Sequence, residues 1–172
     1  MTENEKRNSS KKNLKLIAIC GIFAALVFIG TQIRIPTAIG YINLGDGVIL
    51  IASYFIGPAA FFPAAIGSAL SDLIAGYPMY IAPTFLIKGL MGLIAALIMT
   101  KAHGRKAKGF IIRIIASVAA ELVMVAGYFV FETLYYDAAA AAGSVVFNLI
   151  QAGVAIVLAI PLTYAIRVKN PV

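Results

Sequence analysis

Long apolar segments constrain this chain more than any other feature of its sequence. Residues 14–33, "LKLIAICGIFAALVFIGTQI", form an apolar run of about 20 residues, the length that a helix needs to cross a ~30 Å hydrocarbon core. Similar runs follow at 46–76, 84–100, 109–131 and 144–167. Because 62% of the 172 residues are hydrophobic and only 12% are charged, a soluble core could not bury this much apolar surface. We expect an all-α integral membrane protein.

Basic residues set the expected orientation of these runs. Twelve of the fourteen Lys and Arg residues fall in three clusters: before the first run, in a middle loop and at the end of the chain. They are Lys6, Arg7, Lys11, Lys12 and Lys15, then Lys101, Arg105, Lys106, Lys108 and Arg113, and finally Arg167 and Lys169. Since loops rich in Lys and Arg stay on the cytoplasmic side, both termini and the middle loop should be cytoplasmic. Aromatic residues are not interleaved with these clusters, which argues against a nucleic-acid partner.

This orientation requires an odd number of crossings between the first run and the middle loop. Residues 84–100 supply one crossing, so residues 46–76 must supply two. The sequence "IGPAAFFP" marks the reversal, because Pro58 suits the first turn of a new helix after Gly57. We therefore predict six transmembrane helices in a multi-pass protein of the cell membrane.

The predicted helices define the domains and the outer loops. The domains are a basic cytoplasmic tail at 1–13, a membrane domain at 14–167 and a cytoplasmic tail at 168–172. The outer loops, 35–45, 77–83 and 132–143, carry Tyr41, Tyr77, Tyr80, Tyr135 and Tyr136, and 137–143 is either a flexible loop or an extra turn of the sixth helix. An interfacial aromatic belt accounts for part of these tyrosines. Tyr80 is also a candidate for substrate contact.

Polar residues in or beside the apolar runs mark a candidate site. Asn43 and Asp46 lie at the outer entrance of the second predicted helix, and Lys88 lies near the outer end of the fourth. A charge within hydrocarbon costs about 2.5–3.5 kcal/mol, so such groups pair with one another or line a wet cavity. Asp72 on the third helix lies at the same depth as Lys88. A purely structural ion pair between these two residues and direct contact with a ligand are both open.

The fifth and sixth helices add further polar candidates. Glu121 falls halfway along 109–131, where a carboxyl must be paired, protonated or solvated. Asn148 and Gln151 are three residues apart and therefore share one helix face. Their amides either join helices or bind a planar heterocycle through both donors and acceptors. Convergence in the outer half favours a ligand cavity. The converging residues are Asn43, Asp46, Lys88, Asn148 and Gln151.

Small residues form overlapping stripes on the first helix, at Ala18, Gly21, Ala24 and Ala25. They permit close approach of another helix, either within the chain or from a partner membrane protein. The sequence has no GxxxxGK[ST] phosphate loop and no HExxH or GxSxG motif. Cys20 and His103 each stand alone, so we expect no metal site. We also expect no cofactor in this chain, which cannot power transport by hydrolysing ATP itself.

Three stretches taken in order, "INLGDGVIL", "GPAAFFPAAIGSALSDLIAGY" and "APTFLIKGLMGLIAAL", resemble the substrate-binding S components of energy-coupling factor (ECF) vitamin transporters. The similarity is to the group that includes riboflavin, hydroxymethylpyrimidine and pyridoxine-type S components, and it extends over residues 14–167. It implies a six-helix subunit that captures a vitamin or precursor from outside. It also implies association with a transmembrane coupling subunit and two ATP-binding subunits, which use the ATP.

The same resemblance implies roles for two further segments. The small-residue stripe would dock on the coupling subunit, with Gly21 and Ala25 as the nearest match to the family pattern, and Ala18 and Ala24 beside them. Residues 35–45 would form a lid, and the whole subunit would topple in the membrane to release its cargo. Lys88 and the acids suit a polar, anionic or protonatable ring. The absence of Trp removes the best stacking surface for a large flavin, so a hydroxymethylpyrimidine or pyridoxine-like molecule is favoured.

Two other classes of protein remain as alternatives. A stand-alone small-molecule or ion carrier would show the same intramembrane acid and base residues. An integral membrane enzyme would need a reactive group such as Glu121 or the Asp72 and Lys88 pair, but no other feature of the sequence supports catalysis. We therefore predict a transport subunit that is not an enzyme.

Overall fold

The computed structural model describes residues 2–36, 41–102 and 107–165. Several sequence predictions fall outside the described residues. These are the middle of the lid at 37–40, the loop residues His103, Arg105 and Lys106, the basic residues Arg167 and Lys169, and the tail at 168–172.

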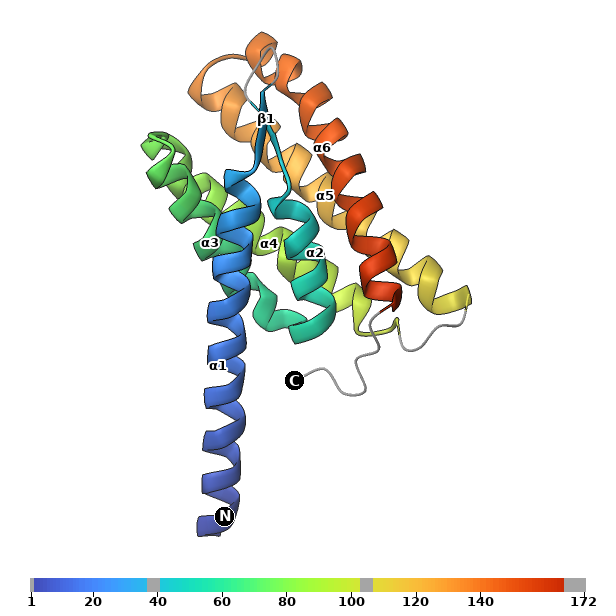
Figure 1. Cartoon of the computed structure of the whole chain (residues 1–172). Coiled ribbons are helices and arrows are strands. Elements are labelled where there is room, and N and C mark those ends of the chain that lie inside the picture. The colour runs from blue at the N-terminus through green and yellow to red at the C-terminus, as the bar shows by residue number, and fades with distance from the viewer. Residues whose placement is uncertain (1, 37–40, 103–106, 166–172) are drawn as a thin grey trace.

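The described residues form a bundle of α-helices (Figure 1), which confirms the all-helical fold class. The helices are α1 (Glu3–Gln32), α2 (Gly45–Ile56), α3 (Phe61–Ile74), α4 (Ile81–Met99), α5 (Ala107–Tyr135) and α6 (Ala138–Ala165). Two 3-10 turns, η1 (Gly57–Ala60) and η2 (Pro78–Tyr80), precede α3 and α4. Strands β1 (Arg34–Pro36) and β2 (Tyr41–Asn43) pair antiparallel between α1 and α2.

Five helical segments of the described chain are long and apolar enough to cross a membrane. One of them, Gly45–Ile74, is interrupted at η1, where Gly57 has a φ of 60° and Pro58 occupies the first turn. Asn43, just before α2, and Asp72, near the end of α3, line one cavity, so the chain reverses between the two helices. This confirms the break predicted at Gly57 and Pro58.

The number of crossings remains a prediction. Helices α2 and α3 contain 12 and 14 residues, which correspond to about 18 Å and 21 Å of helix. Each is shorter than the ~30 Å hydrocarbon core. The structure therefore gives a multi-pass helical protein with one shortened helical hairpin.

Several helices extend beyond their predicted bounds. Helix α1 begins at Glu3, because Thr2 and Glu5 form a capping box in which each side chain accepts a hydrogen bond from the other residue's backbone N–H. The outer loop predicted at 132–143 is much shorter, since α5 continues to Tyr135 and α6 begins at Ala138. The start of α6 confirms the alternative in which 137–143 extends the sixth helix. The Oδ1 atom of Asp137 accepts hydrogen bonds from the N–H groups of Ala139 and Ala140 at 2.8 Å and caps α6.

Close contact between α1 and α3 depends on Gly67. A Cβ atom at this position would lie 2.5 Å from the carbonyl oxygen of Ala24 and 2.9 Å from Cβ of Val27, so the two backbones pack directly against each other. Helix α1 also packs against α2, but only 17% of its apolar window is buried within the chain, the smallest share among the five segments. This leaves a long face of α1 for lipid or a partner helix.

Candidate ligand-binding cavity

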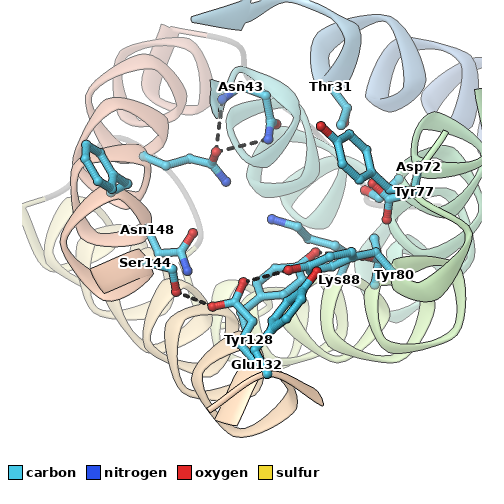
Figure 2. A pocket seen from close by; sticks show the side chains of 15 residues that line it. Thr31, Asn43, Asp72, Tyr77, Tyr80, Lys88, Tyr128, Glu132, Ser144 and Asn148 are labelled. Atoms are coloured by element: carbon cyan, nitrogen blue, oxygen red, sulfur yellow. Dashed lines mark hydrogen bonds between the residues drawn. The ribbon is translucent and has the colours of Figure 1, made fainter. Parts of the chain in front are cut away.

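A cavity of about 200 Å³ lies where β2 and the ends of several helices meet (Figure 2). Its walls combine side chains from α1, β2, α3, η2, α4, α5 and α6. Most of the predicted substrate-binding residues line it, namely Asn43, Tyr80, Lys88, Asn148 and Gln151. The other two, Asp46 and Glu121, are buried outside the lining.

Asp46 is the centre of a buried polar network. The Nζ atom of Lys88 donates to Oδ1 of Asp46 at 2.5 Å, and Nε2 of Gln151 donates to Oδ2 at 2.6 Å. In turn, Oε1 of Gln151 accepts from the backbone N–H of Asn43 at 2.9 Å and from its Nδ2 at 3.0 Å. These charge-assisted and amide hydrogen bonds join β2, α2, α4 and α6. The network fixes the side chains that form one wall of the cavity.

The structure contradicts the ion pair between Asp72 and Lys88, because Lys88 pairs with Asp46. Lys88 and Arg34 act on Asp72 through charge, but Oδ2 of Asp72 is buried and accepts no hydrogen bond within the described part of the chain. Asp72 instead lines the cavity. The position of each charged residue along its predicted helix indicated which charged groups lie at the same depth in the membrane. It did not determine which helix faces meet.

Glu121 lies near the Asp46 and Lys88 pair rather than in the cavity wall. It is 2% exposed and interacts with both residues through charge. Neither of its carboxyl oxygens has a hydrogen-bond partner among the residues that the structure describes. The structure therefore gives Glu121 no direct access to a molecule in the cavity.

A second wall contains residues that the sequence did not single out. Glu132 accepts hydrogen bonds from the hydroxyl of Tyr80 at 3.2 Å and from the hydroxyl of Ser144. Figure 2 shows both contacts as dashed lines, one between Glu132 and Ser144 of α6 and one between Glu132 and Tyr80 of η2. The spacing of Glu121, Tyr128 and Glu132 places all three on one helix face. This periodicity would have identified Glu132 if the helix had been extended past residue 131.

Tyrosine rings complete this wall. The rings of Tyr80 and Tyr128 have centroids 6.3 Å apart, and the hydroxyls of Tyr128 and Thr84 lie 2.9 Å apart. The Nζ atom of Lys88 lies 5.4 Å from the centroid of the Tyr128 ring, a cation–π distance. Aromatic faces of this kind can stack against a planar ring.

Asn148 provides a polar group opposite α3. Its amide points into the cavity (Figure 2), and no described residue forms a hydrogen bond with it. An amide supplies two donors and an acceptor. The cavity therefore combines stacking surfaces with hydrogen-bonding groups for the edge of a small heterocycle. Among the described residues, no group of three or more His, Cys, Asp or Glu side chains is placed to hold a metal ion.

The predicted docking residues occupy two faces of α1. Ala18, Gly21 and Ala25 are exposed, and a Cβ atom at Gly21 would meet nothing within 4 Å. Ala24 instead packs against Gly67 of α3. The first three residues form a stripe that faces away from the rest of the chain, which we call the outer stripe of α1.

Comparison with known proteins gives two matches. A family model described as "ECF-type riboflavin transporter, S component" matches residues 11–168. A protein of Pyrococcus woesei described as "Uncharacterized protein in gap 3'region" is 32% identical over 139 residues, an alignment that covers 79% of this chain and 88% of that protein.

Proposed function

Because the chain belongs to the family of ECF-type riboflavin transporter S components, we propose that its cavity captures a water-soluble vitamin or precursor at the outer face of the cell membrane. Membership of this family makes the chain a substrate-binding transport subunit and not an enzyme. The observation that carries the proposal is the convergence of Asn43, Lys88, Asn148 and Gln151 on one cavity.

We favour a single-ring substrate of the hydroxymethylpyrimidine or pyridoxine type. The cavity volume of about 200 Å³ is below the ~300–1,000 Å³ of pockets for drug-sized ligands. Riboflavin is the second candidate, because the description of the family names it and because Tyr80 and Tyr128 supply stacking surface. Competition between labelled hydroxymethylpyrimidine, pyridoxine and riboflavin on the purified protein distinguishes these candidates.

Delivery of the substrate inward would require an energizing module. Under this proposal a transmembrane coupling subunit and two ATP-binding subunits assemble with the chain, and those subunits use the ATP. This chain itself would hold no cofactor. Proteoliposomes that contain the chain with the module should take up the labelled vitamin only when ATP is supplied. Equal uptake by the chain alone would favour the stand-alone carrier.

The outer stripe of α1 is the proposed surface for the coupling subunit. Gly21→Leu or Ala25→Leu should abolish co-purification with the module, because added volume prevents close helix approach. Vitamin binding should remain, since these side chains do not line the cavity. Ala24→Leu is the matched control and should lower thermal stability instead, because Ala24 is half-buried and its backbone lies against α3 at Gly67, where a larger side chain would crowd the two helices. Loss of vitamin binding in Gly21→Leu would contradict a docking role.

The six-crossing topology predicts opposite accessibility for two loops. In a Cys20→Ala background, a cysteine at Lys101 should react with a membrane-impermeant thiol reagent only from the cytoplasmic side. A cysteine at Met79, on η2, should react only from outside. This pattern follows from the basic clusters and from the reversal at Gly57. Labelling of position 101 from outside would reject the crossing count.

A further inference from the structure

One face of α3 carries two buried polar atoms that lack a hydrogen-bond partner, on residues that line the cavity. Ser68 and Asp72 are four residues apart and therefore share a helix face, and both line the cavity. They are 1% and 7% exposed. The Oγ atom of Ser68 and the Oδ2 atom of Asp72 have no hydrogen-bond partner among the described residues. Buried polar groups normally have one, so this face is suited to a ligand that supplies it.

Four hydrogen-bond donors on the other walls are already engaged within the protein. Lys88 and Gln151 donate to Asp46, and the hydroxyls of Tyr80 and Ser144 donate to Glu132. The carboxylate of Asp72 only accepts hydrogen bonds, whereas a serine hydroxyl both donates and accepts. A donor on the ligand can therefore supply the hydrogen bond that the Oδ2 atom of Asp72 lacks.

The charge of the lining leads to the same requirement. Asp72 and Glu132 are the acidic residues among the described lining residues, and Lys88 is the basic one. Lys88 is neutralised by Asp46 at 2.5 Å. Arg34 acts on Asp72 through charge but does not line the cavity. An anionic ligand would meet an excess of negative charge in a poorly solvated site.

We propose that Ser68 and Asp72 form the edge of the site that determines specificity, by accepting hydrogen bonds from an amino or ammonium group on a small heterocycle. The same edge disfavours relatives that carry a carboxylate or phosphate. This inference rests on the proposed function, because it names the chemical class of substrate for the same cavity. It narrows the sequence prediction, which admitted an anionic ring.

The test measures binding to the full-length chain in lipid nanodiscs with two sets of probes. One set is hydroxymethylpyrimidine with its ring amino group and the same ring with hydrogen in place of that group. The other set is pyridoxamine, pyridoxine and pyridoxic acid, which place an ammonium, a hydroxyl or a carboxylate on one scaffold. In at least one set, the amine should bind about ten-fold or more tightly than its counterparts.

Variants test whether Ser68 and Asp72 cause the preference for the amine. Asp72→Asn should reduce the preference for the amine by about ten-fold or more, and Ser68→Ala should weaken amine binding by about three- to ten-fold. Ser117→Ala is the matched control, because it removes another buried, unpartnered hydroxyl that does not line the cavity. It should leave binding unchanged. If Asp72→Asn does not fold, Ser68→Ala and Ser117→Ala decide. Weaker amine binding in Ser68→Ala alone supports the proposal, and unchanged amine binding in Ser68→Ala contradicts it.

The outcomes separate this inference from the proposed function. An equal or stronger affinity for the counterpart of the amine in both probe sets, an unchanged preference in Asp72→Asn, or binding of riboflavin alone would contradict the proposed role of Ser68 and Asp72 and leave vitamin capture intact. If the wild-type chain binds none of the amines, their counterparts or riboflavin, vitamin capture itself is contradicted, and the edge fails with it.

Discussion

Replacing Lys88 with Met should lower the free energy of unfolding by about 3–5 kcal/mol, the usual effect of removing one partner of a buried ion pair. Asp46 is fully buried, and its Oδ1 atom accepts from Lys88 at 2.5 Å. Without the ammonium, the carboxylate keeps only its hydrogen bond from Gln151. The change should appear as a large fall in the midpoint of thermal unfolding, measured by size-exclusion chromatography after heating.

Two double variants identify the partner of Lys88. Lys88→Met combined with Asp46→Asn should recover most of the lost stability, because the amide can still accept a hydrogen bond and leaves no unpaired charge. Lys88→Met combined with Asp72→Asn should not recover it, since Asp46 remains charged. Rescue by the Asp72 change instead of the Asp46 change would contradict the network described above.

Asn148→Ala and Gln151→Ala should separate ligand binding from folding. The side-chain amide of Asn148 lines the cavity and forms no hydrogen bond with a described residue, so its loss should weaken vitamin binding by about 1–3 kcal/mol and leave the unfolding midpoint unchanged. Gln151 joins Asp46 to Asn43, so its loss should lower both quantities. Isothermal titration and thermal unfolding of the same preparations measure the two effects.

Two results for these variants would contradict a role of the amides in ligand binding. If Asn148→Ala lowers stability as much as Gln151→Ala does, the amide of Asn148 joins helices instead of contacting a ligand. Unchanged vitamin binding in both variants would exclude this wall from the site. Either result would return the amide pair to the structural interpretation that the sequence left open.

The sequence predicted the level of the site well because intramembrane charge is constrained. Asp46, Lys88 and Gln151 had to meet partners or water, and they form one network. The reversal at Gly57 and Pro58 was also predictable, since proline cannot donate the hydrogen bond that a continuing helix requires. Both inferences follow from local chemistry and need no knowledge of how the helices pack.

The partner of Lys88 was not predictable by the same reasoning. Residue depth gives a position along the membrane normal, and both Asp46 and Asp72 are at a suitable depth. The rotation of each helix about its axis decides which acid Lys88 meets. That rotation depends on packing, such as the direct contact of Gly67 with α1, and one sequence does not report it.

Glu132 was missed for a different reason. Residues that face an internal cavity make the end of a helix as polar as a loop, so hydropathy ended α5 at residue 131 although the helix continues to Tyr135. The Asp137 cap of α6 and the capping box of Thr2 and Glu5 were local signals for the longer helices. Capping motifs therefore predict the ends of these helices better than hydropathy does.

We propose that this chain captures a small vitamin-type molecule in the cavity bounded by Asn43, Lys88, Asn148 and Gln151. Native mass spectrometry of the wild-type chain, purified gently from vitamin-fed cells, tests it most directly. We expect a bound small heterocycle that is retained by Gly21→Leu and lost from Asn148→Ala. A wild-type chain that carries no small molecule, or a ligand retained equally by Asn148→Ala, would contradict it.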